Sequence, residues 1–332
     1  MASKTLHTFY LAPFQGITTH VFREVYTRHF SGVSKLYTAF FTGIQTAKSM
    51  RRWGKELKNI RHHNIPVVPQ ILSKDADEIL LFARLCRNLG FEEVNWNLGC
   101  PFPRVAKKMR GSGLLPHPDK VNAILEKVMP DMPVRFSVKC RLGYYHAEEI
   151  FELLPVLNRF PLSELIVHAR LGVQMYKGHP LRETFSKLPA QTVLPLAYNG
   201  DIFSPEDFET AKNNFPQTTR WMLGRGLLAD PFLPALLQGE TLPEVPQVRV
   251  RRYVEDLYVA YRKNFNDSLR AINVMKELWS YLALSFDDPG KVFGKIKKTN
   301  GFDAYEEAVN TIFENFTWMG NGAIRLRDEP VV

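Results

Sequence analysis

The sequence of 332 residues is short of cysteine, with three in all, and their spacing matches neither a disulfide framework nor a zinc site. We therefore expect no bound metal and a reducing compartment. No apolar run approaches the roughly 18 residues of a membrane span, and the polar start of the chain is unlike a signal peptide. These absences together predict a cytoplasmic protein that does not enter a membrane.

Acidic residues are scarce relative to basic ones: 34 Asp and Glu against 43 Lys and Arg give a net charge of +9. This excess suits a polyanionic partner, and nucleic acid is the first candidate because neutralised phosphates release counterions. A generically basic surface explains the total equally well, so the position of the charges matters more than their sum. Hydrophobic residues make up 45% of the chain, which indicates a folded globular protein rather than a disordered one.

A Gly-x-Gly-x-x-Gly motif is also absent after the first expected strand, which disfavours a doubly wound sheet, the competing architecture. Eight short apolar runs alternate instead with amphipathic stretches, a pattern typical of an α/β fold built as a (β/α)8 TIM barrel with parallel strands. The expected strands are residues 8–12, 36–40, 67–72, 93–97, 134–139, 165–168, 194–199 and 220–223. The clearest expected helices are residues 74–89, 119–128, 147–158 and 205–213, the last with Ser204 as its N-cap.

The proline-rich stretch at residues 239–246 has no periodicity, and we place a domain boundary there. Residues 1–240 are expected to form the barrel, whose usual size is roughly 250 residues. Residues 241–332 are expected to form a small helical domain, with helices at 248–264, 268–285 and 303–316 and a break at 289–290.

Two kinds of side chain distinguish this helical segment. The basic run at residues 291–298 is expected to bind a phosphate backbone. The aromatic residues recur at helical spacing, which is more typical of a bundle core than of base-stacking platforms. They are Tyr253, Tyr258, Tyr261, Trp279 and Tyr281.

Polar residues follow most of the expected strands, and in a barrel those positions meet at the rim that carries the active site. The turns at residues 199–201 and 224–226 place glycines and backbone N–H groups where barrels commonly bind a phosphate, with Arg225 close by. The phosphate of flavin mononucleotide (FMN) would fit there, and positive charge on Lys139 and His168 near the ring would stabilise the anionic reduced flavin. Alternatively, polar residues at strand ends only solvate the rim, and Lys139 pairs with an acid.

Cys100 stands in a Gly-Cys-Pro turn directly after the expected strand at residues 93–97. Gly99 allows backbone dihedrals that are closed to other residues, and Pro101 fixes the next φ, so we expect the thiol to be held on a constrained turn. The alternative is a buried small hydrophobic residue. Cys86, with apolar neighbours at helical spacing, is expected in the core, whereas strand alternation leaves the direction of Cys140 open.

Several short motifs follow one another in a specific order, at residues 11–18, 69–70, 95–101, 137–143, 167–170, 174–178, 197–202 and 223–226. Each is weak alone, but their order and spacing resemble those of the tRNA-dihydrouridine synthases, flavoenzymes that reduce uridine in the D-loop of tRNA. The resemblance covers essentially the whole chain. Departures from the usual family pattern fall at residues 14–15, at Asn95, at residues 111–113 and at residues 169–171.

The resemblance implies that Cys100 is the catalytic acid, giving a proton to C5 of uracil after hydride from reduced FMN reaches C6, with NADPH as the reductant. A free thiol, with a pKa of about 8.5, holds such a proton at neutral pH and still gives it up readily. A uridine stacked inside tRNA cannot reach a barrel mouth, so the target base is expected to be flipped out. The implied FMN contacts are Ala12, Pro13, Gln70, Lys139, His168, Asn199, Gly200, Asp201, Gly224 and Arg225. The implied substrate contacts are Asn97, Arg170, Tyr176 and Lys177.

The pattern at residues 276–282 and 302–305 resembles the family branch that acts on position 16 of tRNA, which is favoured here over position 20. Two other functions stay open: an FMN-dependent barrel reductase of a small enone or pyrimidine, and a non-catalytic RNA-binding protein. The basic helical segment favours tRNA as the partner, since a small neutral substrate leaves it without a role. Nothing in the sequence indicates an obligate oligomer, and we expect a monomer.

Overall fold

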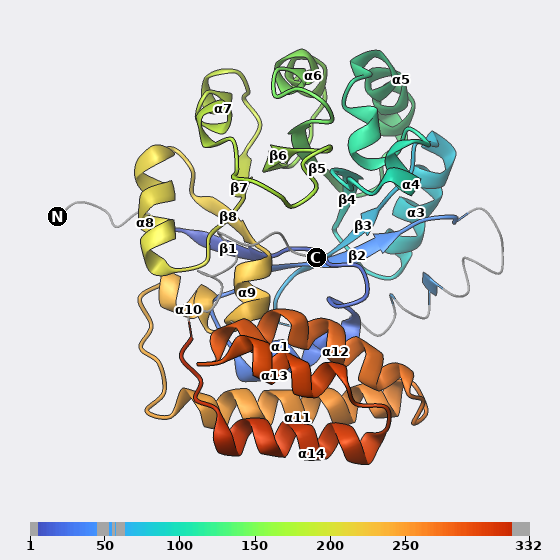
Figure 1. The fold of residues 1–332 in the computed structure, drawn as a ribbon. Coiled ribbons are helices and arrows are strands. Elements are labelled where there is room, and N and C mark those ends of the chain that lie inside the picture. Colours follow the sequence, from blue (N-terminus) through green and yellow to red (C-terminus); the bar gives the residue numbers. More distant parts are fainter. Residues whose placement is uncertain (1–5, 45–52, 55–56, 58–63, 321–332) are drawn as a thin grey trace.

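The computed structural model describes residues 6–44, 53–54, 57 and 64–320. Eight parallel strands form a closed barrel in which the last strand pairs with the first, and helices surround it (Figure 1). This closure confirms the predicted (β/α)8 architecture and excludes the doubly wound sheet. The strands are β1 (Thr8–Leu11), β2 (Lys35–Phe41), β3 (Val67–Ile71), β4 (Glu93–Leu98), β5 (Arg135–Gly143), β6 (Leu165–Leu171), β7 (Leu196–Asn199) and β8 (Arg220–Leu223).

Two neighbouring strands, β5 and β6, are longer than the sequence predicted. β5 continues to Gly143 and β6 to Leu171, because the two strands still pair at that position after a register shift. Arg141 and Arg170 therefore lie within strands rather than in the loops after them. Strand geometry fixes the direction of both side chains, which a loop would not.

β4 alternates between two kinds of surroundings, although all six of its residues are buried. Val94, Trp96 and Leu98 belong to the large apolar core between the strands and the outer helices. Asn95, on the opposite face, is hydrogen-bonded to side chains of the neighbouring strands. The interior of the barrel is thus polar along β4, and residues of other strands form a small apolar cluster around Tyr37, Ile166 and Met222.

The four barrel helices predicted from the sequence agree with observed helices to within two residues, whereas α1, α4, α7 and α10 were not predicted. Ser204 caps α8 as expected, with its hydroxyl accepting a hydrogen bond from the backbone N–H of Asp207 at 3.2 Å. The helices and short 3-10 turns are α1 (His20–His29), α3 (Ala76–Asn88), α4 (Pro103–Ala106), η1 (Gly111–Leu114), α5 (Pro118–Val128), η2 (Met129–Asp131), α6 (Glu149–Leu157), α7 (Arg182–Ser186), η3 (Leu188–Ala190), α8 (Pro205–Asn214), α9 (Arg225–Ala229) and α10 (Leu233–Leu237).

The C-terminal helices form a layer against α1 and α9, on one side of the barrel (Figure 1). Tyr253 contacts the ring of Phe30 at 5.0 Å between centroids, and the hydroxyl of Tyr261 donates to the carbonyl oxygen of Ile17 at 3.2 Å. These contacts attach the layer to the start of the barrel. The helices are α11 (Pro246–Asn264), α12 (Arg270–Leu282), α13 (Pro289–Lys297) and α14 (Phe302–Asn315), with the 3-10 turn η4 (Ala283–Ser285) after α12.

Helix α13 was missed by the sequence analysis, which treated Pro289 and Gly290 only as a break. Proline is tolerated in the first turn of a helix, where its missing N–H has no intrahelical partner. Asp288 caps this turn by accepting from the backbone N–H of Lys291 at 3.0 Å. The basic run therefore lies on a helix, and Lys291, Lys295, Lys297 and Lys298 are all exposed.

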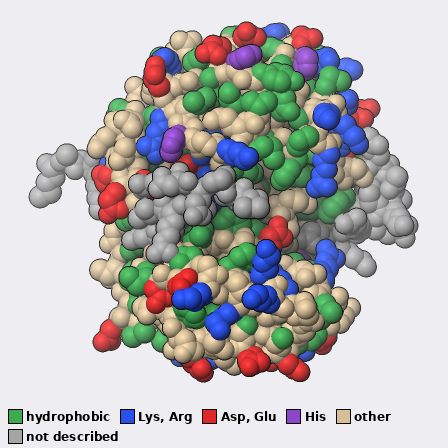
Figure 2. Space-filling model, viewed as in Figure 1, with side chains coloured by type: hydrophobic (Ala, Val, Ile, Leu, Met, Phe, Trp, Pro, Cys, Tyr) green, Lys and Arg blue, Asp and Glu red, His purple; other side chains and the backbone are tan. Residues whose placement is uncertain are grey.

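The aromatic residues of the C-terminal helices divide into two groups. Tyr253, Tyr258, Tyr261 and Trp279 are buried, which confirms their prediction as core. Tyr281 is only partly buried and faces the barrel rim. Lys and Arg side chains gather over α12 and α13 and on the barrel opposite them, on either side of a hollow (Figure 2).

Among the residues that the structure describes, no helix combines the length and apolar character needed to cross a membrane. The same residues include no cluster of three His, Cys, Asp or Glu side chains arranged to hold a metal ion.

Candidate active site

A cavity of about 610 Å³ opens at the carboxyl ends of the barrel strands. Cys100 lies in its wall together with Asn97 and Lys139, and helix α12 contributes Glu277 and Tyr281. A smaller hollow of about 60 Å³ adjoins it, lined by residues that follow β1, β7 and β8. The two spaces share Pro13, Phe14, Lys139, His168, Tyr176 and Arg225 in their linings.

The turn that carries Cys100 is held by Asn97, the last interior residue of β4. The side-chain oxygen Oδ1 of Asn97 accepts hydrogen bonds from the backbone N–H groups of Gly99 and Cys100, at 3.0 and 2.9 Å. From the other side, Ser112 donates its hydroxyl to the carbonyl oxygen of Cys100 at 3.0 Å. A Cβ on Gly111 would lie 2.6 Å from that same oxygen, so only glycine allows this approach. The backbone of Cys100 is therefore fixed on both sides.

Cys100 is buried, with 7% of its surface exposed. Burial raises its pKa, although a backbone hydrogen bond from Phe102 and the nearby positive charges of Arg141, Arg104 and Lys139 oppose that rise. The group is thus a protonated thiol at neutral pH, and the thiolate left after proton loss has cations close by. Cys86 and Cys140 are 0% exposed, so Cys86 is core as predicted, and Cys140 points away from the cavity.

Lys139 lies on β5, across from Asn97. Burial, with the adjacent charge of Arg141, lowers the pKa of Lys139 to about 7. Its Nζ donates to Oδ1 of Asn199 at 2.9 Å, and no carboxylate among the described residues pairs with it. A cation that is buried without an anion suits a negatively charged ligand in this cavity.

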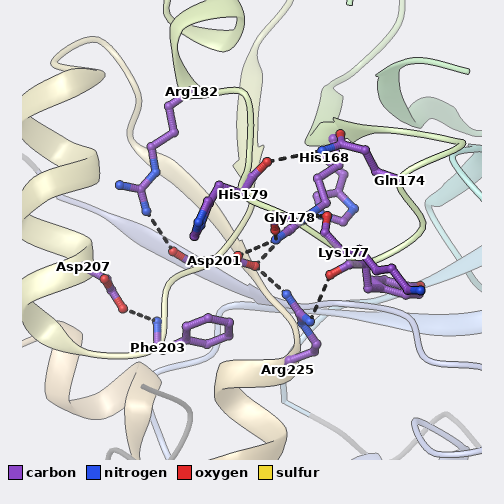
Figure 3. Close-up of polar contacts among 12 residues, drawn as sticks. His168, Gln174, Lys177, Gly178, His179, Arg182, Asp201, Phe203, Asp207 and Arg225 are labelled. Atoms are coloured by element: carbon purple, nitrogen blue, oxygen red, sulfur yellow. Dashed lines mark hydrogen bonds and ion pairs between the residues drawn. The ribbon is translucent and has the colours of Figure 1, made fainter. Parts of the chain in front are cut away.

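Asp201 is the centre of an ionic cluster beside the smaller hollow. Both of its carboxylate oxygens accept from the guanidinium of Arg170, at 2.8 and 2.5 Å, and Arg225 donates to Oδ1 at 2.7 Å. Burial alone would raise the pKa of Asp201, but the hydrogen bonds and charges of the two arginines hold it below its usual value. Figure 3 shows Asp201 between Arg225 and Arg182, and Arg182 donates to its backbone carbonyl at 3.3 Å.

His168 is 9% exposed, and it lies among the cations of the site. Burial and the charges of Arg141, Lys139, Arg170 and Arg225 keep its pKa well below the usual value. The imidazole is therefore neutral, which corrects the expectation that His168 adds positive charge near the ring. Lys139, Arg141 and Arg225 carry the positive charge in this wall of the cavity.

Arg141 is a site residue that was not predicted from the sequence. Its Nε donates to the carbonyl of Gly99 at 3.0 Å, and its NH1 donates to the carbonyls of Leu171 and Met175 at 2.7 and 2.6 Å. One guanidinium thus joins the Cys100 turn to the loop that carries Tyr176. The spacing of two residues from Lys139 on one strand was the available signal, since it places both side chains on the interior face.

Glu277 and Tyr281 were also missed as lining residues. They are four residues apart on α12 and so share one face of the helix. Tyr281 contacts the ring of Phe14 at 6.0 Å between centroids, and the carboxylate of Glu277 lies against Gly16. The C-terminal helical segment therefore completes the wall of the cavity.

Most of the predicted site residues meet at these two spaces, and three do not line them. Gln70 is completely buried under the cavity, where it bonds to Asn95 and Asn97. Arg170 is 1% exposed and is occupied by Asp201 and by the carbonyls of Lys177 and Gly178. The side chain of Lys177 lies outside both linings.

The chain matches one protein family over most of its length. The sequence profile of the dihydrouridine synthases matches residues 10–312. The tRNA-dihydrouridine synthase B of Pasteurella multocida is 26% identical over 264 residues, covering 76% of this chain and 78% of the relative. The tRNA-dihydrouridine(16) synthase of Neisseria meningitidis serogroup A is 24% identical over 311 residues, covering 90% of this chain and 93% of the relative.

Among solved structures, the old yellow enzyme homologue of Zymomonas mobilis is similar in fold, with a TM-score of 0.50 at 12% sequence identity. The match covers 73% of this chain and 90% of that structure. At this identity the similarity concerns the barrel alone.

Proposed function

Because this chain belongs to the dihydrouridine synthase family, we propose that it is a tRNA-dihydrouridine synthase, an FMN-dependent oxidoreductase that uses NADPH to reduce a D-loop uridine of tRNA. The observation that supports this most is the protonated thiol of Cys100 on a fixed turn, in the wall of a cavity whose charged lining residues are all Lys or Arg apart from Glu277. The two relatives named above carry the same activity in their names.

The residues of the cavity suit an FMN group. The smaller hollow offers the turns at Gly200 and Gly224 and the guanidinium of Arg225 for a phosphate, and Lys139 offers an uncompensated cation between this hollow and the main cavity. Ala12, Pro13, His168 and Asn199 complete that lining. When bound and reduced by NADPH, FMN supplies the hydride that adds to C6 of uracil.

Cys100 supplies the other half of the addition. Its S–H bond breaks, the proton goes to C5, and the former C5–C6 double bond becomes a single bond carrying the hydride at C6. The thiolate that is left lies near the backbone N–H of Phe102 and the charges of Arg141 and Lys139, which stabilise it until solvent returns a proton. Asn97 keeps the thiol at the cavity by holding both backbone N–H groups of the turn.

The substrate proposal rests on the C-terminal helices, residues 241–332 in the proposed division of the chain. They line the cavity through α12 and present exposed Lys295, Lys297 and Lys298, which have no ion pair within the described residues. A small enone would meet none of these lysines. We propose uridine 16 as the target, as in the name of the Neisseria relative, with Tyr176, which lines the cavity, beside the base.

The direct test incubates the purified protein with FMN, NADPH and unmodified tRNA transcript, followed by mass spectrometry of nuclease fragments. Dihydrouridine at one D-loop position supports the proposal, and its position identifies the target. Reduction of small enones without any dihydrouridine would replace it by the small-molecule reductase.

The salt dependence provides a second test of the RNA surface. Replacing Lys295, Lys297 and Lys298 by alanine is expected to raise KM for tRNA and to reduce the slope of log affinity against log salt by about 2, with kcat unchanged. The matched control replaces Lys127 of α5, Lys187 directly after α7 and Lys212 of α8, and is expected to leave KM unchanged. Equal effects of both triple variants would contradict the assignment of this surface.

A further inference from the structure

A line of buried polar side chains runs through the interior of the barrel, below the cavity. Glu93, Asn95 and Asn97 alternate along β4, and Gln70 of β3 and Ser137 of β5 lie beside Asn95. None of the five is more than 7% exposed. Such groups lie in a barrel interior only when they are hydrogen-bonded, because an unpaired one costs its full desolvation free energy.

The five side chains form one continuous chain of hydrogen bonds. Ser137 donates its hydroxyl to Oε1 of Glu93 at 2.7 Å and accepts from Nδ2 of Asn95 at 2.9 Å. Oδ1 of Asn95 accepts from Nε2 of Gln70 at 2.8 Å. Oε1 of Gln70 accepts from Nδ2 of Asn97 at 2.7 Å.

This chain has a direction that its two ends determine. Glu93 is a carboxylate paired with Lys35 at 3.3 Å, so it can only accept. At the other end, the backbone N–H groups of Gly99 and Cys100 can only donate, and Oδ1 of Asn97 accepts both. Each amide between these ends has one orientation that satisfies both neighbours. A flipped amide would place two donors or two acceptors against each other.

We propose that Glu93, Ser137 and Asn95 are positioning residues: they act through Gln70 and Asn97 to hold the turn on which Cys100 gives its proton. The proton-donating role of Cys100 rests on the proposed function, whereas the hold on the turn does not. None of the three lines the cavity. They act only by fixing which amide atom of Gln70 and of Asn97 faces the Cys100 turn.

The Ser137→Ala substitution interrupts the chain at its middle. Nδ2 of Asn95 loses its acceptor in a dry interior, and the amide turns away from Gln70 to find another one. The Ser137→Thr substitution avoids this loss, because the threonine hydroxyl can still donate to Glu93 and accept from Asn95. We therefore expect Ser137→Ala to loosen the Cys100 turn, and Ser137→Thr to preserve it.

The rate at which iodoacetamide alkylates Cys100 in the full-length protein measures this loosening without any turnover. Ser137→Ala is expected to raise that rate about fivefold to tenfold, as the loss of one buried hydrogen bond allows. Ser137→Thr, which keeps the hydroxyl, is expected to stay within about twofold of the wild type. Asn95→Leu removes both amide atoms at similar volume and provides a second interruption, with the same expected acceleration.

The matched control is Ser204→Ala, which removes a buried hydroxyl that caps α8. It is expected to lower the melting temperature as Ser137→Ala does, but to leave the alkylation of Cys100 unchanged. Peptide mass spectrometry separates Cys100 from Cys86 and Cys140, which are 0% exposed and report only on unfolding. Equal rates in Ser137→Ala and Ser204→Ala, or an accelerated rate in Ser137→Thr, would overturn the proposal.

A parallel measurement on the FMN-loaded protein separates this inference from the proposed function. Ser137→Ala is expected to slow uridine reduction about fivefold through kcat, with KM for tRNA and flavin reduction by NADPH unchanged. A protein that forms no dihydrouridine, yet shows the alkylation pattern above, would contradict the function and leave the hydrogen-bond chain supported.

Discussion

The two sides of the cavity are held together by different kinds of interaction, neutral hydrogen bonds on one side and ion pairs on the other. On the side of β3, β4 and β5, neutral amides and one hydroxyl lead from Glu93 to the Cys100 turn. On the side of β6, β7 and β8, Asp201 binds two buried arginines. A neutral chain fixes direction, because each amide has a donor and an acceptor end. An ionic cluster fixes position and charge, and it responds to pH and to anions.

This difference matches what each side must do in the proposed reaction. An acid must point its proton at one carbon atom, which requires orientation. A phosphate site must offer positive charge without leaving that charge unbalanced when empty, and Asp201 provides the balance for Arg170 and Arg225. Arg141 connects the two sides, since it holds Gly99 on one and Leu171 on the other.

The largest effect is expected from Cys100→Ala, which removes the proposed proton donor and leaves both hydrogen-bonded sides intact. Dihydrouridine formation in a single turnover should fall by about 100-fold or more, the usual contribution of a general acid. Flavin binding and NADPH oxidation should stay unchanged, as measured by absorption and stopped flow. A parallel loss of flavin binding would mean that Cys100 acts in structure rather than in proton transfer.

Asp201→Asn tests the ionic side. It leaves Arg170 and Arg225 buried beside each other without a carboxylate, and the free energy of unfolding should fall by about 3 kcal/mol in urea. Added phosphate should restore part of that stability, since an anion can replace the carboxylate. The matched control is Glu183→Gln, which breaks the exposed pair with Lys187 and should have little effect. No recovery with phosphate would argue against an anion site here.

Asp201 also makes the free energy of unfolding depend on pH in the acid range. The pKa of Asp201 is lower in the folded protein than in the unfolded chain. Its stabilisation is therefore complete above the unfolded value of about 3.9 and is lost as pH falls through the folded value. Unfolding experiments below about pH 4 should show this slope in the wild type and a weaker one in Asp201→Asn.

A smaller effect, of opposite sign, is expected from Lys139→Met. The pKa of Lys139 is about 7 in the folded protein against about 10.4 in the unfolded chain, so its charge opposes folding. The variant should be more stable than the wild type by about 2 kcal/mol below pH 7, and the gain should fade as pH rises from about 7 to about 10.

Flavin affinity should fall in the Lys139→Met variant, because the uncompensated cation is gone. Urea unfolding across this pH range and fluorescence titration with FMN measure the two effects. Lower stability at neutral pH would contradict the assignment of Lys139 as a residue kept for its ligand.

The sequence predicted the barrel because its signals were local and repeated. Alternating apolar runs and amphipathic stretches mark each unit, and Ser204 marks the start of one helix. Helix α13 was missed because proline both ends and begins helices, and only the cap from Asp288 distinguishes the two. The longer β5 and β6 were missed because strand pairing, which extends them, is not local.

The residues of the site were predictable where a turn has an unusual composition, as at Cys100 and at Gly200. The partners of those residues were not, because Ser137, Asn95 and Gln70 meet only when three strands align. One signal was present in the sequence: Glu93, Asn95 and Asn97 alternate with apolar residues in a strand that is buried on both faces. A polar interior face in such a strand indicates an internal hydrogen-bond network.

The most direct test of the central claim is one anaerobic absorption experiment on the purified, FMN-loaded protein. NADPH should bleach the flavin bands, and unmodified tRNA added afterwards should restore them, with one dihydrouridine formed per flavin reoxidised. A protein that binds no flavin, or a reduced flavin that unmodified tRNA leaves bleached, would contradict the account.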